Sequence, residues 1–184
     1  MSELDRLRAE IAGITKRGIG MPAAGMIYWL AMAWVGSRWG TRSAALLFFI
    51  GTGLVFPIGL GLTRLAGGDL FAKGHPLNGL GGILNAVQAF YWPIAILLFY
   101  KDPMLVPFAL GTLFGSHFLP YGWFYRSRGY TFLGIAAPVA TIVVQIAMPD
   151  RVFVAVPLAM AAMYAVCVAM IAGENRAQKL ASAS

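Results

Sequence analysis

The chain has 184 residues, of which 59% are hydrophobic and 11% are charged. Soluble domains carry about 25% charged residues, so this sequence has too few polar side chains to cover a surface that faces water. We therefore exclude a water-soluble protein and predict an all-α membrane protein. The length indicates one domain.

The net charge of +7 raises the alternative of a nucleic-acid partner, which we exclude. Lys and Arg residues stand singly between apolar runs, whereas nucleic-acid-binding proteins gather them into a patch or stripe. We expect membrane lipids to surround the chain. The single cysteine, Cys167, excludes an intrachain disulfide and a multi-cysteine metal site. Its apolar neighbours indicate a small buried hydrophobe.

Residues 1–18 are expected to form an amphipathic cytoplasmic or interfacial helix. Ser2 and Asp5 make a Ser-x-x-Asp capping signal. Apolar residues then recur at helical spacing among charged ones, at Leu4, Leu7, Ile11 and Ile14. Such a helix lies on the membrane surface or packs on cytoplasmic loops of its own protein. Gly18 and Gly20 are expected to end it.

Residues 19–172 are expected to form six transmembrane helices, and residues 173–184 a cytoplasmic tail. Each apolar segment approaches the ~20 residues that cross a bilayer. The third segment is the least hydrophobic, because it contains Asn78, Asn85 and Gln88. The predicted spans lie near 19–37, 43–63, 77–100, 104–125, 129–148 and 151–172.

The positive charges predict the orientation of these spans. Of the 14 Lys and Arg residues, Arg38, Arg42, Lys101 and Arg151 fall on one side of the membrane, and the others fall on the side of both termini. Cytoplasmic loops carry the excess of Lys and Arg. We therefore predict that both termini are cytoplasmic.

Small residues and prolines indicate how the helices pack and bend. Gly111 and Gly115 form a Gly-xxx-Gly pair, and Ala161, Ala165 and Ala169 form a second stripe that lets another helix approach closely. Prolines recur in the second to sixth spans. Such prolines are tolerated in membranes where neighbouring groups satisfy the freed carbonyls, so we expect kinked helices.

The chemistry concentrates in the third and fourth spans. His117, Tyr121 and Tyr125 are spaced four apart and share a helical face. The third span carries its own polar face, made of Asn78, Gly81, Asn85, Gln88 and Trp92. An amide in hydrocarbon needs hydrogen-bond partners, so this face should look into the bundle. We predict a ligand-binding site lined by Asn85, Gln88, Tyr91, His117 and Tyr121.

Each of these features also has a structural interpretation. Amides that join helices are common in membrane proteins, and His117 could be a neutral imidazole bonded to a neighbour rather than a proton relay or ligand contact. The group Tyr121–Tyr125 is typical of an aromatic belt at the membrane interface, next to Arg126 and Arg128. These alternatives stay open.

The sequence argues against a metal site, a bound cofactor and catalytic activity. One cysteine, two histidines and no acidic residue in any span leave too few ligands for a usual zinc site. There is no phosphate-binding loop, His-Glu-x-x-His or Gly-x-Ser-x-Gly motif. We predict that the protein is not an enzyme and has no cofactor.

Several motifs resemble a family of small bacterial integral membrane proteins of unknown function. They are Lys16-Arg-Gly-Ile19, Asp69-Leu-Phe71, Pro76-Leu-Asn78-x-Leu80 and Gly115-Ser-His-Phe-Leu-Pro-Tyr-Gly-Trp-Phe-Tyr125. The likeness covers nearly the whole chain, and the His-x-x-Pro-Tyr-x-Trp run is its most specific part. Gly74-His75 departs from the acidic or amide residue expected before Pro76, which argues against a binding role for His75. The resemblance implies a multi-pass protein of the bacterial plasma (inner) membrane.

These observations lead to two hypotheses of function. The first is a small transport or ligand-binding protein with a polar site between the third and fourth helices. The second is a non-catalytic structural or partner-binding membrane subunit. In that case the small-residue faces would dock a second copy in a homo-oligomer or another membrane protein.

Overall fold

The computed structural model describes residues 2–181, whose regular structure is entirely helical. In this part of the chain, two long helices near each end of the chain flank four short ones, and a further short helix comes first. The longer helices are α2 (Gly20–Arg38), α3 (Thr41–Leu65), α8 (Arg128–Ala147) and α9 (Val152–Ala181). The shorter ones are α1 (Glu3–Thr15), α4 (Asn78–Ala86), α5 (Trp92–Lys101), α6 (Val106–Ser116) and α7 (Leu119–Phe124). The described residues also contain short 3-10 segments, at η1 (Lys16–Gly18), η2 (Val87–Tyr91), η3 (Pro103–Leu105) and η4 (Pro149–Arg151).

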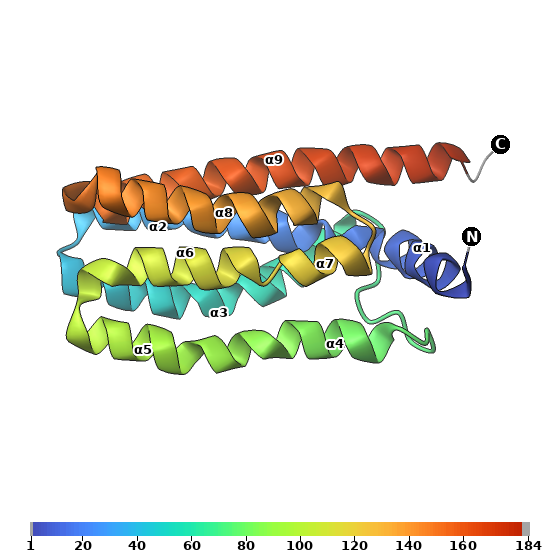
Figure 1. Cartoon of the computed structure of the whole chain (residues 1–184), viewed down its shortest axis with the longest axis horizontal. Coiled ribbons are helices and arrows are strands. Elements are labelled where there is room, and N and C mark those ends of the chain that lie inside the picture. Colours follow the sequence, from blue (N-terminus) through green and yellow to red (C-terminus); the bar gives the residue numbers. More distant parts are fainter. Residues whose placement is uncertain (1, 182–184) are drawn as a thin grey trace.

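The helices run side by side along the long axis of the molecule, and the chain reverses direction at each end (Figure 1). The first and last described helices reach the same end. Two pairs of short helices lie end to end: α4 continues through η2 into α5, and α6 continues into α7 (Figure 1). The arrangement is therefore a bundle of antiparallel rods, two of which are interrupted.

Within the described residues, five helical stretches are long and apolar enough to cross a membrane, which supports a membrane protein. They are Glu3–Arg38, Thr41–Leu65, Asn78–Lys101, Arg128–Ala147 and Pro149–Ala181. The prediction of six spans is thus confirmed only in part. The predicted span at 104–125 is divided into α6 and α7, and neither piece has the ~20 residues that cross a bilayer.

The break between α6 and α7 follows from Pro120. Proline has no backbone N–H to donate to the carbonyl four residues earlier, here that of Ser116. The Phe118 N–H bonds the Gly115 carbonyl at 3.2 Å, three residues back, instead of that of Phe114. The chain therefore leaves the α-helix at His117 and Phe118 and restarts at Leu119.

Prolines inside the longer helices do not divide them. Pro57, Pro138 and Pro157 lie inside α3, α8 and α9, which continue through them. Pro107 occupies the first turn of α6, where a missing N–H donor leaves no hydrogen bond unmade. Pro93 occupies the first turn of α5 after the 3-10 segment η2, as Pro120 occupies the first turn of α7. The expectation of kinks in the second to sixth spans therefore applies most clearly to the third and fourth.

Glycines allow the closest helix contacts in the core. A methyl group at Gly25 of α2 would overlap the ring of Tyr164 on α9. Methyl groups at Gly111 and Gly115 would overlap Thr141 and Ala137. The predicted Gly-xxx-Gly pair therefore packs α6 onto α8, as its spacing indicates.

The alanine stripe behaves differently. Ala161 is buried, but Ala165 and Ala169 are exposed, so this face is not a packing surface within the chain. α9 instead meets α2 through glycines of that helix, since a methyl group at Gly36 would overlap the backbone of Phe153.

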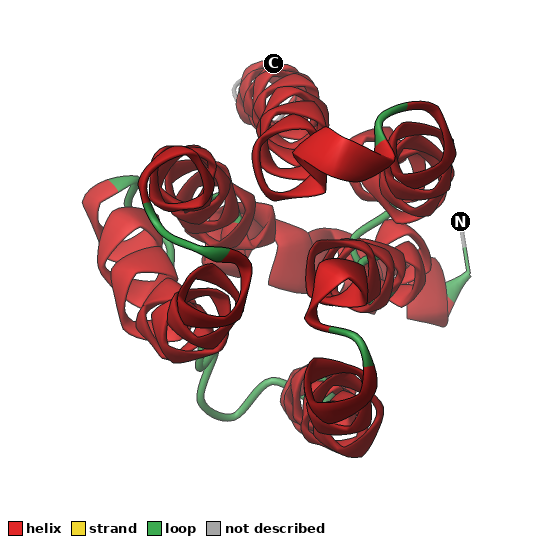
Figure 2. Cartoon of the chain, turned by 90° about the vertical axis from the view of Figure 1, so that its left-hand side faces the viewer, coloured by secondary structure: helices red, strands yellow, loops and turns green. Residues whose placement is uncertain are grey.

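The rod formed by α4, η2 and α5 lies at the edge of the bundle, apart from the other helices in both views (Figures 1 and 2). No residue of α4 is buried, and Ala95 is the buried residue of α5. Phe49 of α3 touches this rod, with ring centroids 5.6 Å from those of Trp92 and Phe99. The third predicted span is therefore the least packed of the described helices.

α1 begins as predicted, because the Ser2 hydroxyl accepts a hydrogen bond from the Asp5 N–H at 3.1 Å. It ends where Lys16, Arg17 and Gly18 adopt positive φ values of 50°, 52° and 58°. The helix packs on the rest of its own chain rather than standing free, since Ile11, Ala12 and Thr15 are buried.

α9 continues into the segment 173–184, which the sequence predicts to be a cytoplasmic tail. The helix reaches Ala181, and residues 182–184 lie outside the described part. Tertiary contacts explain the extension: Asn175 donates to the Lys16 carbonyl at 3.0 Å, and Gln178 donates to the Ala9 carbonyl at 2.8 Å. The end of α9 thereby holds α1 against the bundle.

Candidate functional site

A cavity of about 450 Å³ lies among α2, α3, α4 and the junction of α6 with α7. Its volume falls in the range of small-molecule sites, ~300–1,000 Å³. Four of the five predicted site residues line it: Asn85, Gln88, His117 and Tyr121. Tyr91 is not among the lining residues, because on its rod the cavity ends at Gln88 and Tyr91 lies about one turn farther along.

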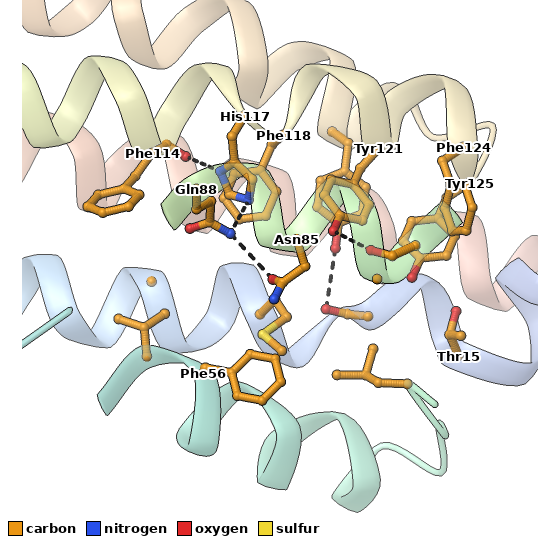
Figure 3. A pocket seen from close by; sticks show the side chains of 18 of the residues that line it. Thr15, Phe56, Asn85, Gln88, Phe114, His117, Phe118, Tyr121, Phe124 and Tyr125 are labelled. Atoms are coloured by element: carbon orange, nitrogen blue, oxygen red, sulfur yellow. Dashed lines mark hydrogen bonds between the residues drawn. The ribbon is translucent and has the colours of Figure 1, made fainter. Parts of the chain in front are cut away.

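A chain of hydrogen bonds joins the two interrupted rods at this cavity (Figure 3). The Nδ1 atom of His117 lies 2.8 Å from the Phe114 carbonyl oxygen. Because a carbonyl only accepts, Nδ1 carries the proton and donates. In the neutral ring, Nε2 then accepts from the amide nitrogen of Gln88 at 2.9 Å. The same amide nitrogen donates to Asn85 Oδ1 at 3.4 Å.

The helix break supplies the acceptor for His117. The Phe114 carbonyl would receive the Phe118 N–H in an unbroken helix, but that N–H bonds Gly115 instead. The freed carbonyl accepts from His117 and, at 3.4 Å, from the Tyr164 hydroxyl. His117 therefore satisfies a carbonyl exposed by the break and also holds the neighbouring rod through Gln88.

Aromatic rings form one wall of the cavity (Figure 3). The ring centroids of Tyr121, Tyr125 and Tyr130 lie 5.8 Å from one another. Phe118 stacks on Tyr130 at 5.4 Å. Such offset aromatic contacts make a rigid surface. The Tyr130 hydroxyl donates to the Arg17 carbonyl at 2.7 Å and fixes the cluster to the turn after α1.

This arrangement corrects the interpretation of residues 121–125 as an interfacial belt. Trp123 is exposed, and the guanidinium of Arg8 lies 4.3 Å from its ring centroid. Phe124 and Tyr125 are buried and line the cavity with Tyr121. The belt interpretation fails for these residues because α7 directs its other faces into the bundle.

Tyr125 shares the predicted face with His117, so its place at the cavity follows from the spacing even though it was not included in the predicted site. Tyr130 and Tyr164 come from α8 and α9. No local pattern relates them to His117, and only the packing of separate helices brings them to the same wall.

No Asp, Glu, Lys or Arg occurs among the described residues that line the cavity. The polar lining consists of amides, hydroxyls and the His117 ring. Across residues 2–181, no group of three His, Cys, Asp or Glu side chains is placed to hold a metal ion. Chemically, the site offers neutral hydrogen-bonding groups beside a flat apolar surface.

The end of the cavity nearest the termini is closed by α1 and the following turn, through Ile11, Thr15 and Gly18. A buried cluster fastens this segment: Arg17 lies 3.4 Å from Glu174 and donates to Asn175 at 2.7 Å. Glu174 also accepts from the Arg128 N–H at 2.8 Å, at the start of α8. α1 and the turn after it thus form a cover held by α8 and α9.

The apolar helices, with a cavity lined by neutral groups among them, support the assignment of the chain to the helical membrane proteins. Within that class, the chain belongs to a family of unknown function, DUF7010, whose model matches residues 4–174. Membership agrees with the resemblance to an uncharacterised family. No curated protein matches the chain, and no solved structure does.

Proposed function

We propose that the protein crosses the bacterial plasma membrane six times, with both termini in the cytoplasm and α6 and α7 together forming the fourth span. These two helices lie end to end along the bundle axis (Figure 1). The turn between α2 and α3, the end of α5 and the turn between α8 and α9 lie at the end of the bundle away from the termini (Figure 1). Arg38, Arg42, Lys101 and Arg151 belong to these segments. The other Lys and Arg residues belong to the end that holds the termini, as expected for a cytoplasmic side.

Within this topology, the protein is a small transport or ligand-binding protein whose site is the cavity between the third and fourth spans. One observation carries the proposal. Both spans leave the α-helix beside the cavity, and Gln88 of one bonds His117 of the other at 2.9 Å. Interrupted helices expose polar groups within a membrane, and transporters use them to bind substrates near the bilayer midplane.

The second candidate is a non-catalytic subunit that binds a partner or a second copy of the chain. It is favoured by the outer face of the α4–α5 rod, where Ile83, Phe90 and Leu97 are exposed. Lipid chains would cover this face equally well. In both candidates the protein has no enzymatic activity, since the cavity brings together no nucleophile with a base to activate it.

Variants with one added cysteine test whether the cavity is open to water. Gly82 lines the cavity, and a methyl group added there has no neighbour within 4 Å. The adjacent Ile83 is 64% exposed but does not line the cavity, so it serves as the matched lipid-facing control. Native Cys167 is fully buried, which keeps background labelling low. Gly82→Cys and Ile83→Cys would be treated in vesicles with an uncharged, sugar-linked thiol reagent that does not cross lipid.

We expect Gly82→Cys to react and Ile83→Cys to remain unreacted, because a thiolate forms and meets the reagent only where water reaches it. Reaction from both sides of the membrane supports transport. Reaction from one side supports a ligand-binding protein open to that side. If Gly82→Cys reacts from neither side, the cavity is closed to solutes and the subunit hypothesis replaces the first one.

A further inference from the structure

The charge of the cavity lining restricts what can enter it. The lining lacks Asp, Glu, Lys and Arg among the described residues, and the hydrogen bonds of His117 are those of a neutral ring. A charged ligand would lose its hydration here and gain no opposite charge, which is costly in a low-dielectric interior. The site therefore favours an uncharged molecule.

The hydrogen bonds within the lining leave defined polar atoms free. Both hydrogens of the Gln88 amide are directed to His117 and Asn85. Asn85 Nδ2 remains a donor and Gln88 Oε1 an acceptor, and neither has a partner among residues 2–181. Figure 3 shows the amide nitrogen of Asn85 turned away from Gln88 toward Phe56. These two side chains thus offer one donor and one acceptor to a ligand.

The rest of the wall is flat and apolar. Tyr121 lies beside His117, with ring centroids 5.9 Å apart, and stacks on Tyr125. Phe56 of α3 stands across the cavity from these rings (Figure 3). Two facing aromatic surfaces fit a planar body better than a branched aliphatic one, because ring stacking adds to the area buried.

We infer that the cavity binds an uncharged, planar aromatic molecule that carries both a hydrogen-bond donor and an acceptor, with Asn85 and Gln88 as the polar contacts. This inference rests on the proposed binding function of the cavity. It names the class of ligand, and it assigns specificity to the free amide atoms rather than to His117.

Three probes of nearly the same shape test the class of ligand: benzamide, which is neutral, benzoate, which is an anion, and benzamidinium, which is a cation. Each would be added to full-length Gly82→Cys before the uncharged thiol reagent, and the labelling rate would be measured. We expect benzamide to slow labelling. The charged probes should need at least about tenfold higher concentrations for the same protection, since burial of an uncompensated charge is unfavourable.

Two further variants, made in the Gly82→Cys background, separate recognition from folding. Asn85→Leu removes the free donor from an exposed side chain whose single hydrogen bond is long, at 3.4 Å. Thr112→Val removes a hydrogen bond to Thr141 between α6 and α8, outside the cavity. Asn85→Leu should raise the protective concentration of benzamide by about tenfold, the effect of losing one hydrogen bond to a ligand. Thr112→Val should leave it unchanged.

The outcomes distinguish this inference from the proposed function beneath it. Equal or better protection by benzoate or benzamidinium overturns the ligand class. Protection by none of the three probes also overturns it, while reaction at Gly82→Cys still supports a water-accessible cavity. If Gly82→Cys does not react at all, the proposed function fails first. Protection by benzamide that Asn85→Leu weakens and Thr112→Val retains supports the inference.

Discussion

At the scale of single residues, His117 combines the two roles that the sequence left as alternatives. It bonds the carbonyl freed by the helix break and the amide of a neighbouring span. It also borders the cavity. A polar residue in a membrane interior is costly unless bonded, and here the bonds that satisfy His117 also fix one wall of the proposed site.

The bond between His117 and Gln88 should appear as a non-additive pair in stability measurements. His117→Phe and Gln88→Leu should each lower the free energy of unfolding, by about 0.6–2 kcal/mol, because each leaves the partner unbonded. The double variant should lose less than the sum, since neither partner is then left alone. Denaturation in detergent would measure the cycle. Strict additivity would show that the bond contributes nothing. The control is Tyr91→Phe, a change outside the cavity.

Glycine contacts give a second residue-scale prediction. Gly25→Ala should destabilise the bundle by about 1–3 kcal/mol, because the new methyl group overlaps the ring of Tyr164. Gly53→Ala is the matched control, since Gly53 lies on an exposed helix face with no atom within 4 Å of the added methyl group. It should stabilise by up to about 1 kcal/mol through helix propensity. Equal melting temperatures for the two variants would contradict the packing of α2 on α9.

At the scale of elements, α1 depends on its partners more than on its own sequence. Its apolar positions predict a helix, yet the contacts that hold it come from η1 and the end of α9. Those residues are polar and charged, and in the sequence they are typical of a solvated tail. This is why the extension of α9 to Ala181 was not predicted.

Removing the charge of Glu174 should release α1. Glu174→Gln leaves the buried Arg17 without its ion-pair partner, at a cost of about 1.5–3 kcal/mol. Limited trypsin digestion of inverted vesicles should then cut within residues 2–17 about tenfold faster or more. The control is Glu3→Gln, the same change at an exposed position of α1. Unchanged cleavage of the Glu174 variant would show that other contacts hold the helix.

Hydropathy predicted most helix boundaries to within a few residues, but it predicted neither the end of α9 nor the interruptions. Hydropathy treats 104–125 as one apolar segment, whereas the break depends on the one N–H that Pro120 lacks. Helical spacing was more informative than hydropathy about the site. It grouped Asn85, Gln88, His117 and Tyr121, and all four line the cavity. The tyrosines of α8 and α9 were missed because nothing in a single sequence shows which helices meet.

At the scale of the whole molecule, the alternation of helices makes the topology testable. Reporter fusions at Lys101 and Asp150 should read as periplasmic, and fusions at Lys73 and Ser184 as cytoplasmic. The positive charges predict this orientation, and the chain reverses between these positions (Figure 1). A cytoplasmic signal at Lys101 would mean that the α4–α5 rod does not cross, and the orientation of the preceding spans would need revision.

The sparse packing of the α4–α5 rod has a consequence for how the protein is made. Gln88 leaves the ribosome 29 residues before its partner His117. Until then, the amides of the third span have no partner from the fourth, and hydrocarbon offers them none. The third span is therefore poorly suited to enter lipid by itself. In the proposed six-span topology, we therefore expect the third span to stay at the insertion machinery until the fourth emerges, so that the two enter the membrane as a pair.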